Sequence, residues 1–202
     1  MKNQIHNSAL NSKLICGLAF FALTPFFAQA HIIPGEANGF TSGLNHPLHG
    51  LDHILAMVAV GLWAAQLGGR CLWLVPATFV SLMTVGGALG MLGVHVPMVE
   101  AGILVSVLVL GMLIAAKARL PLVVSMALVG LFAIFHGHAH GTEIPMAASG
   151  LSYALGFVLA TAALHACGIG LGLLAQKRLA DPALRFAGAG IALAGVCLWL
   201  SV

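Results

Sequence analysis

Long apolar stretches recur along this chain and are separated by short polar links. Beyond residue 30 there are six of them, at 47–67, 71–93, 97–116, 120–140, 147–174 and 183–202. Each is close to or above the roughly 20 residues that an α-helix needs to cross the hydrocarbon core of a bilayer. Because backbone groups inside a bilayer must be hydrogen-bonded within the protein, the pattern predicts an all-α membrane protein with six transmembrane helices.

The first thirty residues follow a different pattern. Lys2 and Lys13 precede or flank an apolar stretch at 14–27, and the small-x-small sequence Ala-Gln-Ala follows at 28–30. This order is typical of a cleavable signal peptide. We therefore predict a signal peptide at 1–30 and one six-helix transmembrane domain at 31–202. An uncleaved first span is the alternative.

Charge and composition add the orientation of the chain. Only 6% of the residues are charged and 60% are hydrophobic, whereas a soluble domain has roughly 25% charged residues, so a water-soluble globule is excluded and the bilayer is the first partner. The positive charges beyond the signal peptide fall in alternate links: Arg70, then Lys117 and Arg119, then Lys177, Arg178 and Arg185. By the positive-inside rule these links are cytoplasmic. We expect a bacterial inner-membrane protein with both mature termini periplasmic.

The first candidate chemistry lies at the start of the first span, in the sequence HPLHGLDH at 46–53. A helix that begins at Pro47 would place His49 and His53 on one face, with His46 one turn earlier and Asp52 beside them. Neutral imidazole nitrogen and carboxylate oxygen are ligands for Ni²⁺, Co²⁺, Zn²⁺ and Cu²⁺. Asp52 either binds the metal directly or holds a histidine tautomer.

The second candidate stretch, FHGHAHGTE at 135–143, ends the fourth span. Helical spacing puts His136, His140 and Glu143 on one face and His138 on another. This span runs from inside to outside, so its end lies on the same side as the start of the first span, and we expect the two stretches to meet around one ion. Ionisable groups near the membrane interior usually mark an ion pathway. The alternative is a polar helix end wetted by headgroups.

Other polar residues are less decisive. Cleavage after position 30 would leave His31 at the amino terminus, where its α-amine and ring can chelate a metal together. His165, midway down the fifth span, is either a packing residue or a ligand. Glu100 is a gate, an extra ligand or a residue at headgroup depth. The four cysteines show no C-x-x-C spacing and indicate no thiolate site.

The two histidine-rich stretches resemble the H-P-x-x-G-x-D-H and F-H-G-x-A-H-G-x-E patterns of the HupE/UreJ family, which is described as small nickel/cobalt permeases associated with hydrogenase or urease maturation. The resemblance covers essentially the whole chain. It implies that 31–202 is a transporter domain with no catalytic residues and no prosthetic group, and that Ni²⁺ or Co²⁺ is the transported ion. The residues that match the family patterns are His46, Asp52, His53, His136, His140 and Glu143. His49 and His138 occupy variable positions.

Rival functions remain open at this stage. No G-x-x-x-x-G-K-[ST] sequence occurs, so we do not expect direct ATP drive from this chain. A membrane-embedded metalloenzyme would use the same ligands with Glu143 or Asp52 as general base. A metal sensor or chaperone subunit would bind the ion without transporting it. We expect no nucleic-acid partner, and the sequence decides neither nickel against cobalt nor whether the chain forms a homo-oligomer.

Overall fold

The computed structural model describes residues 39–144, 149–178 and 182–201. The predicted signal peptide and His31 lie outside the described residues. All secondary structure within these three ranges is helical: α2 (Gly39–Asn45), a 3₁₀ turn (His46–Leu48), α3 (Leu51–Leu67), α4 (Cys71–Met91), α5 (Val99–Ala115), α6 (Leu122–Thr142), α7 (Gly150–Arg178) and α8 (Pro182–Leu200). The all-α prediction is confirmed for the described part of the chain.

Helices α3 to α8 correspond one by one to the six predicted apolar stretches. Four of them, α4, α6, α7 and α8, are long and apolar enough to cross a membrane, which makes the chain a multi-pass membrane protein. Helix α5 is apolar but has 17 residues, which is about 26 Å of helix against a hydrocarbon core of about 30 Å. Helix α3 also has 17 residues and joins the preceding segment through a bend of 79°. Six complete spans stay a prediction.

The prediction that the first long helix begins at Pro47 is wrong. Pro47 lies in the short 3₁₀ turn, and Gly50 is extended with φ −101° and ψ 118°, so α3 begins only at Leu51. The break separates His49 from the helix that carries His53. His49 is exposed, and its Nδ1 lies 2.8 Å from the carbonyl oxygen of Asn45.

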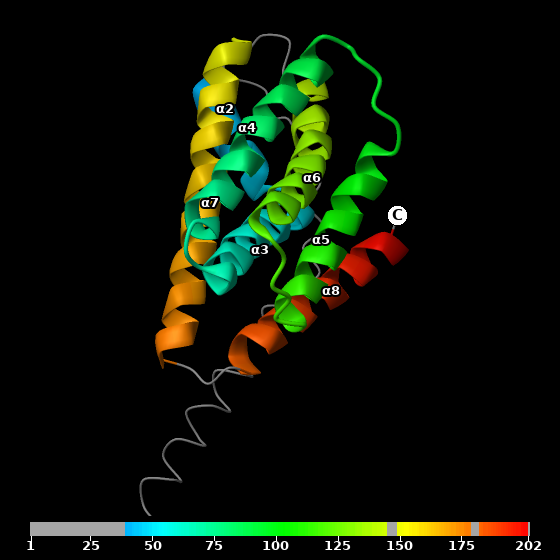
Figure 1. Cartoon of the computed structure of the whole chain (residues 1–202). Coiled ribbons are helices and arrows are strands. Elements are labelled where there is room, and N and C mark those ends of the chain that lie inside the picture. Colours follow the sequence, from blue (N-terminus) through cyan, green and yellow to red (C-terminus); the bar gives the residue numbers. More distant parts are fainter. Residues whose placement is uncertain (1–38, 145–148, 179–181, 202) are drawn as a thin grey trace, which may run out of the picture.

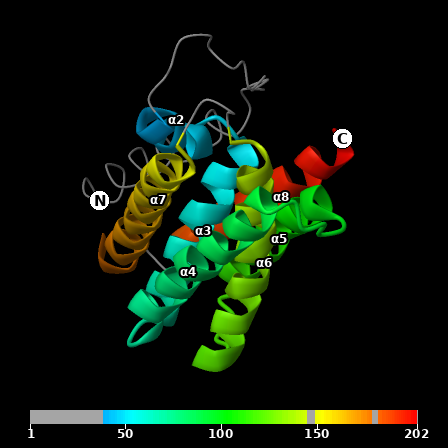
Figure 2. The same cartoon turned by 90° about the horizontal axis from the view of Figure 1, so that it is seen from above.

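The helices alternate in direction and surround α3. Figure 1 shows that the links from α3 to α4 and from α5 to α6 lie at one end of the bundle, and that the link from α4 to α5 lies at the other. Seen from above in Figure 2, α3 lies in the middle, and it packs against α4, α5, α7 and α8. Met57, Val60 and Trp63 of α3 are fully buried, so α3 forms the core of the bundle.

Glycines let several of these helices touch backbone to backbone, as is common in membranes. Gly61 of α3 faces Gly168 of α7, and Gly111 of α5 faces Gly188 of α8. At each of these positions a Cβ atom would overlap backbone atoms of the facing helix. Small residues along the spans therefore have a packing role at these two interfaces.

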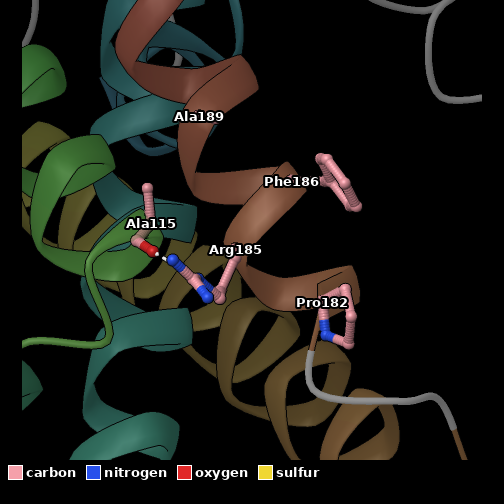
Figure 3. Close-up of a pocket in the computed structure, with 5 residues that line it drawn as sticks. All are labelled: Ala115, Pro182, Arg185, Phe186 and Ala189. Carbon is pink, nitrogen blue, oxygen red and sulfur yellow. Dashed lines mark hydrogen bonds between the residues drawn. The ribbon is translucent and has the colours of Figure 1, made fainter.

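A polar side chain caps the carboxyl terminus of α5, which lies next to the start of α8. Arg185 donates a hydrogen bond from Nε to the carbonyl oxygen of Ala115, at 3.0 Å (Figure 3). A cation at this position suits the negative end of a helix and satisfies a carbonyl that has no partner within α5. The shallow pocket beside this contact is lined by Ala115, Pro182, Arg185, Phe186 and Ala189. It contains no histidine or carboxylate.

Candidate metal centre

The two histidine-rich stretches meet inside the bundle, next to the 3₁₀ turn. The ring centroids of His53 and His140 are 4.2 Å apart, and those of His53 and His136 are 4.8 Å apart. His46 joins from the 3₁₀ turn, with its ring centroid 4.6 Å from that of His140. Four imidazoles from three segments therefore form one continuous row.

The outer end of this row is an imidazole–carboxylate pair. His46 Nε2 lies 2.9 Å from Glu143 Oε2, and the side chains are 27% and 54% exposed. One ligand atom each from His46, His140 and Glu143 lies within 4.8 Å of the others. Two ligands on opposite sides of an ion, with bonds of about 2.1 Å, are about 4.2 Å apart. A small side-chain adjustment would therefore place these three around one small divalent ion.

Asp52 orients the imidazole of His53. Its Oδ1 accepts hydrogen bonds from the backbone N–H of His53 and from His53 Nδ1, both at 2.8 Å. A carboxylate only accepts, so Nδ1 carries the proton and Nε2 keeps the lone pair. That Nε2 is buried and has no hydrogen-bond partner. Of the two roles considered for Asp52, the geometry favours the orienting one, because a carboxylate that holds the other ring nitrogen is typical of metal-binding histidines.

Ser106 of α5 plays a similar part for His136, which is fully buried. The Ser106 hydroxyl lies 2.6 Å from the carbonyl oxygen of Ile103 and 2.9 Å from His136 Nε2. Since the single hydroxyl proton is donated to the carbonyl, Nε2 of His136 is the donor to Ser106 Oγ. Its Nδ1 then carries the lone pair, and that atom is buried without a partner. The sequence offered no signal for Ser106, which lies in an apolar helix far from both stretches.

His140 lies between the other rings and makes no hydrogen bond at either nitrogen, although it is only 4% exposed. A buried polar atom without a partner is rare and calls for an explanation. The row contains four such nitrogen atoms: one on His53, one on His136 and two on His140. Unsatisfied lone pairs that converge in a buried space are suited to binding a cation.

Helix α7 closes the third side of the row with aromatic side chains. The rings of Phe157 and His140 are 4.1 Å apart, and those of Tyr153 and His46 are 5.8 Å apart. This apolar wall limits access of water to the imidazoles. Tyr153 is buried as a core residue is, and the sequence did not predict its contact with His46. The only available signal was the four-residue spacing of Tyr153 and Phe157.

The glycines of the second stretch have a separate function from its histidines. Gly137 and Gly141 each follow a histidine directly and face α4, where a Cβ atom would overlap the carbonyl oxygens of Met83 and Gly87. Helix α6 can therefore approach α4 closely with one face and turn His136 inward with another. The alternation of histidine and small residues at 136–141 therefore serves both the close contact with α4 and the inward placement of the histidines.

Three further residues do not belong to the row. His49 Nδ1 lies 2.8 Å from the carbonyl oxygen of Asn45, outside the row, and its role as a metal ligand stays a prediction. His138 lies elsewhere, as predicted: its Nε2 is 2.7 Å from the carbonyl oxygen of Val94. Glu100 is exposed in the first turn of α5, where a carboxylate interacts favourably with the helix dipole.

Together these observations define a class: a multi-pass helical membrane protein with buried histidines, and with carboxylates beside them, near one end of the bundle. The sequence profile of the HupE / UreJ protein family matches residues 18–198, and the chain belongs to this family. It is 47% identical over 187 residues to Protein HupE of Rhizobium leguminosarum bv. viciae, an alignment that covers 93% of this chain and 97% of that protein. No solved structure gives a significant match.

Proposed function

We propose that this chain is a secondary permease that takes up divalent nickel, and cobalt as a second substrate, across the bacterial inner membrane. The observation that carries the proposal is the row of buried imidazoles with unpartnered nitrogens at the meeting point of α3 and α6. Imidazole and carboxylate suit both ions. Membership in the HupE/UreJ family supports a transporter of a metal ion rather than an enzyme.

The exposure of the ligands supports a direction of movement. Glu143 and His46 are the most exposed, the His53 side chain is 12% exposed, and His136 is fully buried. A hydrated ion that arrives from the periplasm would meet the carboxylate first and then exchange its waters for imidazoles one by one. This orientation assumes six spans with periplasmic termini, as the distribution of positive charge predicts.

Uptake of radiolabelled nickel into cells that lack their own nickel importers tests the proposal. We expect the intact chain to accumulate label, cobalt to compete, and His53→Ala to abolish accumulation at matched membrane expression. The control is His95→Ala, because His95 lies exposed in the link between α4 and α5. An intact chain that binds nickel but accumulates none would exclude the permease. Metal that stays bound in stoichiometric amount after mild chelation would favour the metalloenzyme.

Asp52→Asn is expected to weaken nickel binding by about 10- to 100-fold without removing it, which is the usual cost of changing a group that orients a metal-binding histidine. The amide oxygen can still accept a hydrogen bond from His53 Nδ1. The negative charge of Asp52, which makes the ring a stronger electron-pair donor to the metal, is lost. Titration calorimetry on the purified protein measures the change. An effect as large as that of His53→Ala would instead indicate that Asp52 binds the metal directly.

A further inference from the structure

One more histidine lies buried in the bundle beyond the row. His165 of α7 is 2% exposed, and neither of its ring nitrogens has a hydrogen-bond partner. The sequence left two roles open for it, packing or ligation. A packing histidine is normally hydrogen-bonded, because burying an unpaired polar group costs free energy. His165 does not fit that description.

His165 continues a buried line of side chains on α7 that starts at the row of imidazoles. The line consists of Tyr153, Phe157, Thr161 and His165, spaced four residues apart and at most 5% exposed. Residues at this spacing share one face of a helix. The first two members touch His46 and His140. From the helical rise, His165 lies about 18 Å along α7 from Tyr153, well inside the membrane.

Helix α4 provides the facing side. The ring of Phe79 is 5.2 Å from that of His165 and 5.7 Å from that of His136, so it contacts both histidines. One turn further along α4, Met83 presents its Sδ to the hydroxyl of Thr161 at 3.7 Å. The contact of Met83 with Thr161 lies one helical turn from the contact of Phe79 with His165. An imidazole, a thioether sulfur and a hydroxyl therefore lie on two successive turns between α4 and α7.

The third side is held closely by α3. A Cβ atom on Gly61 would overlap the backbone carbonyl of His165, and Gly168, one turn later on α7, faces Gly61 as well. The backbone of α7 is thus fixed against α3 at His165. A histidine on such a rigid segment keeps one position relative to α4.

We propose that His165, with Met83 and Thr161, forms a second and inner binding station for the divalent ion. The inference rests on the proposed permease function and extends it to the inner half of the path. Imidazole and thioether both bind borderline and soft transition metals. The station offers fewer strong ligands than the outer row, and weak sites in series let an ion leave as well as bind.

Two substitutions separate ligation from packing. His165→Leu places an apolar side chain of comparable size against Phe79 and removes both ring nitrogens. His165→Cys replaces the imidazole by another metal ligand. At matched membrane expression we expect His165→Leu to lower nickel uptake by roughly tenfold or more, the scale of lost metal-site interactions, with unchanged thermal stability. His165→Cys should retain part of the uptake. The control Leu164→Ala, at the same depth, should lower stability and leave uptake per folded molecule unchanged.

A binding measurement makes the result independent of transport. In purified protein that carries His53→Ala and His140→Ala, we expect Co²⁺ to give a residual ligand-field absorption that His165→Leu removes. Absence of that signal, or full uptake by His165→Leu, would overturn the inner station. An intact chain that imports no nickel would contradict the permease alone, because the cobalt absorption does not depend on transport.

Discussion

His140→Leu is expected to abolish nickel uptake while leaving the protein folded. His140 contacts both His46 and His53, and neither of its ring nitrogens is hydrogen-bonded. The substitution removes a central ligand, so we expect the initial rate of uptake to fall about 100-fold or more. It also removes two buried unpaired polar atoms, so the thermal stability of the metal-free protein should not decrease.

The matched control for this variant lies two residues away. His138 is buried on the same helix, but its Nε2 donates a hydrogen bond to the Val94 carbonyl oxygen and it does not join the row. His138→Ala should therefore cost about 0.5–1.5 kcal/mol of stability, the usual contribution of one hydrogen bond, and keep uptake per folded molecule. If His140→Leu imported as fast as the intact chain, the row would not be the binding site.

Gly137→Ala is expected to destabilise the bundle strongly. The added Cβ atom would overlap the backbone carbonyl oxygen of Met83, and a backbone atom within a packed helix cannot move aside as a flexible side chain can. Overpacking of this kind typically costs about 1–3 kcal/mol. We expect less folded protein in the membrane and a lower melting temperature after purification in detergent.

Gly170→Ala is the matched control, since Gly170 is exposed on α7 and a Cβ atom there would meet nothing within 4 Å. Alanine is the better helix former by about 0.8–1.0 kcal/mol, so this variant should be at least as stable as the intact chain. Equal stability of the two alanine variants would show that α4 and α6 are further apart than described.

Much of the fold could be predicted because the length and hydropathy of each apolar stretch indicate by themselves that it lies in the membrane. A membrane interior demands local helix formation, and the six stretches at 47–202 required no knowledge of their neighbours. The grouping of His136, His140 and Glu143 was likewise a matter of helical spacing. The one local error was the start of α3, where Gly50 adopts an extended conformation and the helix begins only at Leu51, after His49.

The long-range partners were beyond the reach of sequence reasoning. Ser106 reaches His136 from another helix, 30 residues away in the chain, and Phe79 contacts His136 and His165 from a third. Nothing in the apolar sequences around them distinguishes these side chains from ordinary core residues.

The sequence by itself therefore determined that this is a helical membrane protein, and it named the histidines and carboxylates that lie together. Periodicity and hydropathy depend only on residues that are neighbours in the sequence, so they can be determined without the tertiary structure. Only the tertiary structure decided which ring nitrogens keep their lone pairs, since that depends on hydrogen bonds to Asp52 and Ser106. It alone also placed His165 beyond the row, because the packing of α3, α4 and α7 brings that residue and Phe79 together.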